Sequence, residues 1–104
     1  LVSAARALAA DPAAATLAGT ATAARTSQRT LTRLVRHEVG MTFPQWRTQL
    51  RLAQSLLLLA DGHTVTATAH RCGWRNASGY TAAFRAALGT TPARYQRSLS
   101  GPAR

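Results

Sequence analysis

Acidic side chains are scarce in this 104-residue chain, and lysine is absent altogether. Only Asp11, Glu38 and Asp61 carry negative charge, against 13 basic residues that are all arginine. The formal net charge is therefore +10 at pH 7. A charge excess of this size attracts polyanions, whether DNA, RNA or an acidic membrane surface. The composition predicts an anionic partner.

Residues suited to catalysis or metal binding are equally few. A single cysteine excludes an internal disulfide framework. A metal centre would need the scattered potential nitrogen and sulfur ligands to converge, namely His37, His63, His70 and Cys72, and these lack the clustered spacing of a zinc site. Three dispersed carboxylates are poor material for an activated nucleophile, and no phosphate-binding glycine-rich loop occurs. We expect no enzyme, no cofactor and no metal.

Long apolar runs and strand-like alternation are missing as well. The longest apolar run, residues 56–60, is far shorter than the ~20 residues that span a bilayer. We therefore expect a soluble cytoplasmic protein with no membrane partner, in which the lone thiol of Cys72 is buried. Because the chain begins at Leu1 rather than Met, we also expect it to be a piece of a longer protein.

What the chain does contain is an internal repeat with an offset of 49 residues. Four polar or glycine positions recur, Thr32, Arg36, Gly40 and Thr42 being matched by Thr81, Arg85, Gly89 and Thr91. Four apolar positions keep the same register, pairing Leu31 with Tyr80, Val35 with Phe84, Val39 with Leu88, and Trp46 with Tyr95. The repeat predicts two copies of one small helical unit.

Helix start and stop signals divide the first copy. A short helix over residues 3–10 ends before Pro12, and Thr16 offers an N-cap for a second helix. After a turn at residues 25–27, Ser27 caps a third helix with an inward face that includes Leu31 and Val35. Gly40 supplies its C-terminal stop.

A long helix over about residues 43–61 then links the two copies. Thr42 and Gln45 have the spacing of a capping box. Two neighbouring apolar stripes follow, one made of Leu50, Ala53, Leu57 and Ala60, the other of Leu52, Leu56 and Leu59. The width of this apolar face predicts a helix buried on both stripes.

The second copy repeats the logic of the first. Thr64 caps a helix that ends at Cys72, which we place at the same 49-residue offset, and Asn76 caps a sixth helix with Tyr80, Phe84 and Leu88 inward. Thr91 caps a last helix, followed by a tail from Ser100. The prediction is an all-α fold of about seven helices. One helix-turn-helix lobe covers about residues 3–41, the linking helix about 43–61, and the other lobe about 64–99.

Paired helix-turn-helix units in so basic a chain point to double-stranded DNA. In the first unit the predicted base-reading residues share one exposed arc: Gln28, Arg29, Thr32 and Arg33. In the second unit the corresponding residues are smaller: Ala77, Ser78 and Thr81. Phosphate contacts are predicted for Ser27, Arg36, Arg47, Arg75 and Arg85. The contrast predicts lopsided specificity, with the first unit fixing the sequence and the second mainly adding affinity.

Specific motifs then suggest a family. Residues 69–74 (AHRCGW), 76–80 (NASGY) and 84–95 (FRAALGTTPARY) resemble the patterns A-x-x-x-G-[FY], F-[KR] and G-x-[ST]-P-x-x-[FY]-R of AraC/XylS-type bacterial transcription regulators. Residues 51–53 resemble the family's R-[LM]-x-x-A stretch, with the alanine earlier than in the pattern. The resemblance covers residues 16–96. Trp74 replaces the usual phenylalanine or tyrosine, Gln96 the usual arginine, and Ala82 a frequent polar groove residue.

The resemblance implies a DNA-binding domain in which each recognition helix enters one of two successive major-groove segments, about 34 Å apart. It also implies RNA polymerase as a partner, and a sensing or dimerisation domain N-terminal to this piece. Two alternatives stay open. One is a basic protein that coats nucleic acids without reading sequence, although few aromatic residues are free to stack on bases. The other is the regulatory module of a larger DNA-repair enzyme.

Overall fold

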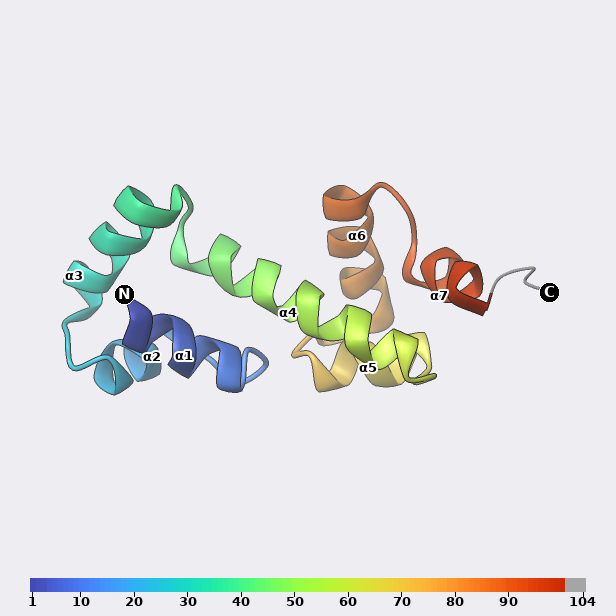
Figure 1. Ribbon diagram of the computed structural model, residues 1–104, viewed down its shortest axis with the longest axis horizontal. Helices are drawn as coiled ribbons and strands as arrows, with labels where there is room; N and C mark the ends of the chain where they lie inside the picture. Colours follow the sequence, from blue (N-terminus) through green and yellow to red (C-terminus); the bar gives the residue numbers. More distant parts are fainter. Residues whose placement is uncertain (101–104) are drawn as a thin grey trace. The chain divides into compact units, whose positions relative to one another are not determined.

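The computed structural model describes residues 1–100 and is helical throughout, with no strand in that range (Figure 1). The elements in chain order are α1 (Val2–Ala10), α2 (Leu17–Ala23), α3 (Gln28–Leu34), a π-helical turn η1 (Val35–Val39), α4 (Phe43–Ala60), α5 (Val65–Arg71), α6 (Ala77–Leu88) and α7 (Pro92–Ser100). The predicted all-α fold of seven helices is confirmed. The tail was predicted one residue too early, because Ser100 still belongs to α7. Residues 101–104 lie outside the described part.

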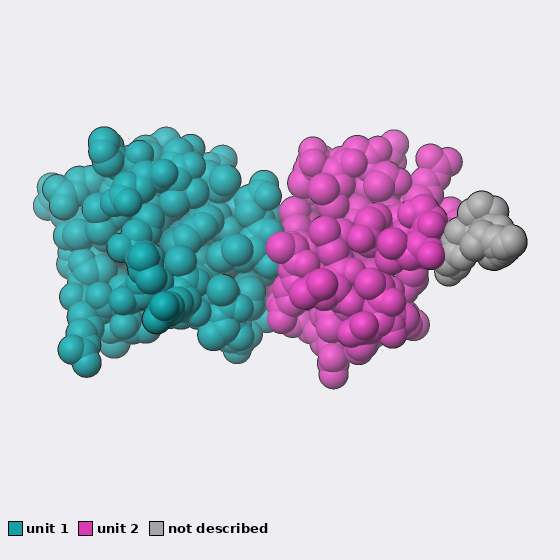
Figure 2. All heavy atoms as spheres, viewed as in Figure 1, with its two compact units in different colours: residues 1–51 teal, residues 52–104 magenta. Residues whose placement is uncertain are grey.

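The chain divides into two compact units, residues 1–51 and 52–104 (Figure 2). The first unit holds α1, α2, α3, η1 and the beginning of α4. The second holds the rest of α4 together with α5, α6 and α7. Each unit therefore contains one pair of helices joined by a tight turn, α2 with α3 and α5 with α6.

Aliphatic side chains dominate the core of the first unit. The buried members are Ala4, Leu8, Ala21, Leu31, Val35 and Phe43. Trp46 is half-buried and packs edge-on against Phe43, with ring centroids 6.5 Å apart. The inward residues of α3 are thus held by α1, α2 and α4, which leaves the opposite face of α3 to solvent.

Aromatic side chains replace aliphatic ones in the core of the second unit. The buried members are Leu52, Leu59, Ala69, Tyr80 and Phe84. A chain of ring contacts runs through them, with centroid distances of 5.0 Å from Trp74 to Tyr80, 5.7 Å from Tyr80 to Phe84 and 5.8 Å from Phe84 to Tyr95. The larger rings fill space that Leu31 and Val35 fill in the first unit, as the repeat register predicts.

Every predicted N-cap forms, and this sets where each helix begins. The cap side chain accepts a hydrogen bond from the backbone N–H three residues on at Thr16 (2.9 Å), Ser27 (3.1 Å), Thr42 (3.2 Å), Thr64 (3.1 Å), Asn76 (2.8 Å) and Thr91 (3.2 Å). Such caps stabilise a helix by about 1 kcal/mol each. Gly40 and Gly89 end α3–η1 and α6 in the left-handed conformation, with φ of 78° and 76°.

Two predictions about buried faces are wrong. Leu57 is 69% exposed, and its stripe partners Ala53 and Ala60 are exposed too, because α4 buries Leu52, Ser55 and Leu59 instead. Ser55 can occupy the core since its hydroxyl donates to the carbonyl of Leu52 over 2.6 Å. Leu57 lies about 200° round the helix from Ser55 and therefore faces outward.

Leu88 was predicted to face inward with Tyr80 and Phe84, and it is 47% exposed. It is the last residue of α6, directly before the left-handed Gly89 that turns the chain away. No further turn of helix follows to cover it. The core of the second unit therefore stops at Phe84 on this helix.

The repeat offset is also not uniform. The caps Thr16 and Thr64 lie 48 residues apart, whereas Ser27 and Asn76 lie 49 apart. The additional residue lies in the turn between α5 and α6, which is one residue longer than the turn between α2 and α3. The prediction that α5 matches α2 at an offset of 49 is therefore wrong by one residue.

Candidate DNA interface

The outer face of α3 presents four polar side chains together. Ser27 fixes Gln28 as the first helical residue, and Leu31 turns inward with 1% of its surface exposed. Thr30 and Leu34 are half-buried, and the remaining residues of α3 are exposed. All four predicted base-reading residues are exposed: Gln28, Arg29, Thr32 and Arg33. The structure thus places them on one arc of the helix, as a major-groove reader requires.

The arginines of this face are not committed to other protein groups. Arg29, Arg33 and Arg36 are exposed and have no side-chain hydrogen-bond or ion-pair partner within residues 1–100. Glu38, the only acidic residue of α3 and η1, forms no ion pair in that range. The guanidinium groups therefore keep their full donor capacity for base edges or phosphates.

The corresponding face of α6 is smaller and less polar. Ala77 and Thr81 are half-buried and Ser78 is exposed. Two predicted phosphate-contacting arginines flank them, Arg75 in the turn before α6 and Arg85 near the end of that helix, and both are exposed. This face offers few side chains for hydrogen bonding to bases.

Two arginines of α4 point the other way, into the first unit. The Arg47 Nη1 donates to the Ala15 carbonyl over 3.0 Å, and Arg51 donates to the carbonyls of Pro12 and Ala13 over 2.7 and 2.8 Å. Together they hold the loop between α1 and α2. The phosphate contact predicted for Arg47 is untested, but one of its donors is already used internally. No sequence signal separated these inward arginines from the outward ones.

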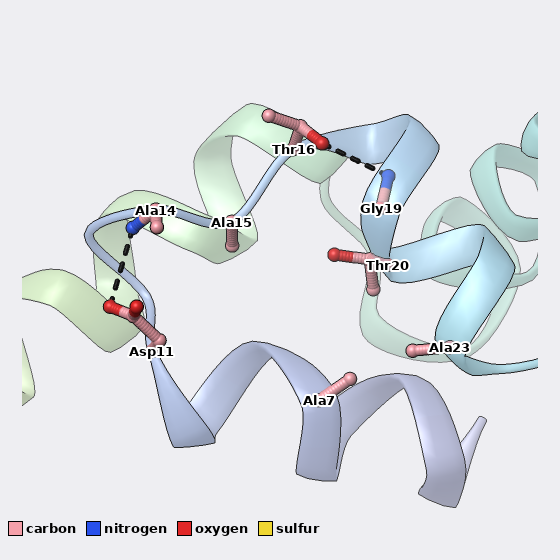
Figure 3. Close-up of a pocket in the computed structure, with 8 residues that line it drawn as sticks. All are labelled: Ala7, Asp11, Ala14, Ala15, Thr16, Gly19, Thr20 and Ala23. Carbon is pink, nitrogen blue, oxygen red and sulfur yellow. Dashed lines mark hydrogen bonds between the residues drawn. The ribbon is translucent and has the colours of Figure 1, made fainter.

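The loop that they hold lines a hollow of about 220 Å³ beside α1 and α2 (Figure 3). Half of the labelled residues are alanine, and the one charged group among them is the carboxylate of Asp11, which accepts a 3.4 Å hydrogen bond from the Ala14 N–H. Across the hollow Thr16 caps α2 at Gly19. A negative group in this place does not suit DNA phosphates, so this hollow is no part of the candidate interface.

Gln96 explains one departure from the family pattern. Its Nε2 donates to the carbonyls of Leu59 (3.1 Å) and His63 (2.7 Å), where α4 ends. An amide supplies two such donors, as a guanidinium also would. Gln96 therefore performs a donor role at the place where the family usually has arginine.

Buried polar groups sit beneath α6 in the second unit. The Tyr80 hydroxyl and the Thr68 Oγ1 are buried without a hydrogen-bond partner, and Cys72 is fully buried as predicted. Burial raises the pKa of Tyr80 above its ordinary value, the neighbouring Cys72 thiol adds to that shift, and the nearby Ser55 hydroxyl opposes it. Ser55 donates its one hydroxyl proton to the Leu52 carbonyl, so it has none to donate to the Tyr80 oxygen.

The histidines do not converge on one another. His63 contacts the Leu58 carbonyl through Nδ1 (3.1 Å) and Arg71 through Nε2 (3.2 Å). Within residues 1–100 no three histidine, cysteine or acidic side chains are grouped so as to hold a metal ion. In the same range no helix has the length and apolar character to cross a membrane.

Comparison with known proteins decides the family. A family model described as a helix-turn-helix domain matches residues 20–98, a range that begins within α2 and includes all of α3, α5 and α6. A transcriptional regulator from Chromobacterium violaceum, described as containing an AraC-type DNA-binding domain, has the same fold with a TM-score of 0.91 at 20% identity, over 98% of this chain and 93% of that one. The chain belongs to the AraC-type helix-turn-helix family.

Two further relatives of this AraC-type domain are informative. The HTH-type transcriptional regulator NimR of Escherichia coli K12 is 42% identical over 74 residues, or 71% of this chain, and the chain spans only 27% of the length of NimR. The DNA-binding domain of AdpA, solved in complex with a target DNA, is 30% identical with a TM-score of 0.80, covering 96% of this chain and 93% of that domain.

Proposed function

We propose that this AraC-type domain is the DNA-reading part of a bacterial transcription regulator, and that α3 and α6 enter successive major-groove segments of one duplex. The observation that carries the proposal is the outer face of α3, where four exposed polar side chains have no hydrogen-bond or ion-pair partner within residues 1–100, while the inward face is packed in the core. The family membership and the net charge of +10 support the same conclusion.

Within this proposal the residues divide by role. Gln28, Arg29, Thr32 and Arg33 read base edges, with arginine pairing to guanine and glutamine to adenine. Ala77, Ser78 and Thr81 approach thymine methyl groups without adding much discrimination. Ser27, Arg36, Arg75 and Arg85 position the protein on phosphates. Arg47 contributes to phosphate binding only through the donors that its bond to Ala15 leaves unused.

The longer protein supplies the remaining partners. NimR and the other curated relatives are transcriptional regulators of which this chain spans about a quarter, 27% in the case of NimR. We infer that a sensing or dimerisation domain precedes this domain, and that the whole protein acts on RNA polymerase in the cytoplasm. The domain itself supplies binding rather than catalysis.

Selection of duplexes from a random pool at ~150 mM salt tests the proposal. We expect a motif of two blocks one helical turn apart, bound ~10³-fold or more above scrambled duplex, with more sequence information in the block read by α3. Equal, salt-sensitive binding to any DNA or RNA would instead mean a nucleic-acid-coating protein. Equal information in both blocks would overturn the division of labour between the two helices.

A further inference from the structure

The two copies of the repeat differ at the start of the helix that follows each recognition helix. In the first unit Thr42 and Gln45 close a reciprocal capping box. The Thr42 N–H donates to the Gln45 Oε1 over 3.0 Å, and the Gln45 N–H donates to the Thr42 Oγ1 over 3.2 Å. Both backbone N–H groups of this pair therefore have a hydrogen-bond acceptor.

In the second unit only one half of that box exists. Thr91 and Arg94 occupy the same repeat positions, and the Arg94 N–H donates to the Thr91 Oγ1 over 3.2 Å. A guanidinium has no acceptor, so Arg94 cannot return the bond. The N–H of Thr91 therefore has no acceptor within residues 1–100.

This open donor lies at a hollow that carries positive charge. The hollow has a volume of about 270 Å³ and is lined by Arg85, Gly89, Thr90, Thr91 and Arg94. Arg85 comes from the end of α6 and Arg94 from the first turn of α7, so the two cations approach it from two elements. Neither has a side-chain partner within residues 1–100, and no acidic residue lines the hollow.

We propose that this hollow is a seat for one DNA phosphate, with Arg94 as a binding residue that the sequence analysis did not include. The inference rests on the proposed function and deepens it, because it names how the second unit holds the duplex. Two guanidinium groups and a free backbone N–H, together with the positive end of α7, provide the donors that a phosphate oxygen accepts. The first unit has no equivalent phosphate-binding hollow, because the Gln45 side chain already accepts the hydrogen bond of the Thr42 N–H.

The asymmetry also accounts for how α6 could act with so few base-reading side chains. A phosphate held between the end of α6 and the start of α7 would fix the depth and register of α6 in its groove. The first unit has four polar readers on α3 and closes its box. The second unit has fewer base-reading side chains and a stronger contact with the DNA backbone.

The Arg94→Gln variant tests the seat, because glutamine recreates the first unit's capping box while removing the cation. We expect an affinity loss of about tenfold on both selected and scrambled duplex, and a salt dependence (log K against log salt) shallower by about 1. The thermal midpoint should be unchanged or higher, which separates lost binding from lost folding. Arg97→Gln, on the same helix but away from this hollow, is the control of equal charge and should leave the salt slope unchanged.

Duplexes carrying a single neutral methylphosphonate then locate the contact. One position should weaken the wild-type protein more than it weakens Arg94→Gln, because in the variant only Arg85 still contacts that phosphate. The seat is overturned if Arg94→Gln keeps the wild-type slope, if Arg97→Gln loses as much, or if no such position exists. Sequence preference is measured on the wild type alone, and a wild type without preference would reject the proposed function. The comparison of Arg94→Gln with Arg97→Gln would still show whether this hollow binds a phosphate.

Discussion

Arg51 holds Pro12 across 39 residues of chain: its Nε donates to the Pro12 carbonyl over 2.7 Å, and its Nη2 reaches the next carbonyl, that of Ala13, over 2.8 Å. The two bonds use the fork of a guanidinium, which a point-like ammonium cannot reproduce. They tie the loop before α2 to α4, and so hold the frame against which α3 packs. Arg51 therefore uses these donors to hold the loop within the first unit.

Arg51→Lys should lower the free energy of unfolding of the first unit by about 1–3 kcal/mol, because at least one hydrogen bond to a charged donor is lost. Trp46 lies in the first unit and Trp74 in the second, so urea unfolding followed by fluorescence in variants that keep one tryptophan reports each unit separately. The exposed Arg97→Lys is the matched control. Equal midpoints for Arg51→Lys and the parent protein would show that the loop needs no such tie.

Arg33 and Arg85 should separate reading from positioning. Arg33→Ala should cost ~1–3 kcal/mol on the selected site and relax the preference at one base pair, because Arg33 stands on the exposed arc of α3. Arg85→Ala should weaken all duplexes about equally and reduce the salt slope. Titrations on selected and scrambled DNA over a salt series measure both effects. Unchanged affinity of Arg33→Ala for both duplexes would remove α3 from the interface.

Gly79 lowers the helix propensity of α6, although the space around it would admit a Cβ atom. A Cβ at this position would meet the Asn76 Oδ1 at 3.5 Å and the Trp74 Cδ1 at 3.7 Å, which is ordinary contact. Gly79→Ala should therefore stabilise the second unit by about 0.5–1 kcal/mol, the difference in helix propensity. Thermal unfolding followed through Trp74 measures the change.

Gly73→Ala provides a contrast of opposite sign to Gly79→Ala. Gly73 has φ of 98°, so an alanine there should cost about 1–2 kcal/mol. Arg25, at the matching place in the first turn, already tolerates a φ of 57°, which lies in the small left-handed region open to L-residues. A destabilised Gly79→Ala would mean that α6 needs a glycine for a reason other than local space.

Local features of the fold were predictable from sequence, and features set by distant contacts were not. Each N-cap depends on residues three apart, so the spacing of Thr42 and Gln45 alone predicts where their helix begins. The apolar pattern marked two stripes of α4, and which of them is buried depends on the distant partners of Leu52 and Leu59. Exposed polar residues on α3 were predicted because the buried face of that helix is marked by Leu31 and Val35.

The arginines show the same limit at the candidate site. Arg29, Arg47 and Arg94 are chemically identical in the sequence, and their roles differ through what surrounds them. Arg47 lies half-buried against a loop 32 residues away, whereas Arg94 borders a hollow whose other cation comes from α6. Only the repeat could have pointed to Arg94, because its counterpart Gln45 accepts a bond that arginine cannot accept.

Tyr80 should make the second unit sensitive to alkaline pH. Burial raises its pKa above the ordinary value of 10.0, so the folded state keeps the phenol proton at a pH where the unfolded chain releases it. The stabilisation from this proton is complete below the ordinary pKa and declines as the pH rises through the raised one. Tyr80→Phe should therefore lose less stability than the parent as the pH rises above the ordinary value of 10.0.

At neutral pH the same Tyr80→Phe variant should be as stable as the parent or more stable by up to about 1 kcal/mol, because it removes a buried hydroxyl that has no hydrogen-bond partner. Urea midpoints at stepped pH under reducing conditions measure both effects, with Tyr95→Phe, at a half-buried ring in the same aromatic chain, as the control. A parallel alkaline decline of the parent and Tyr80→Phe would show that the phenol of Tyr80 does not control it.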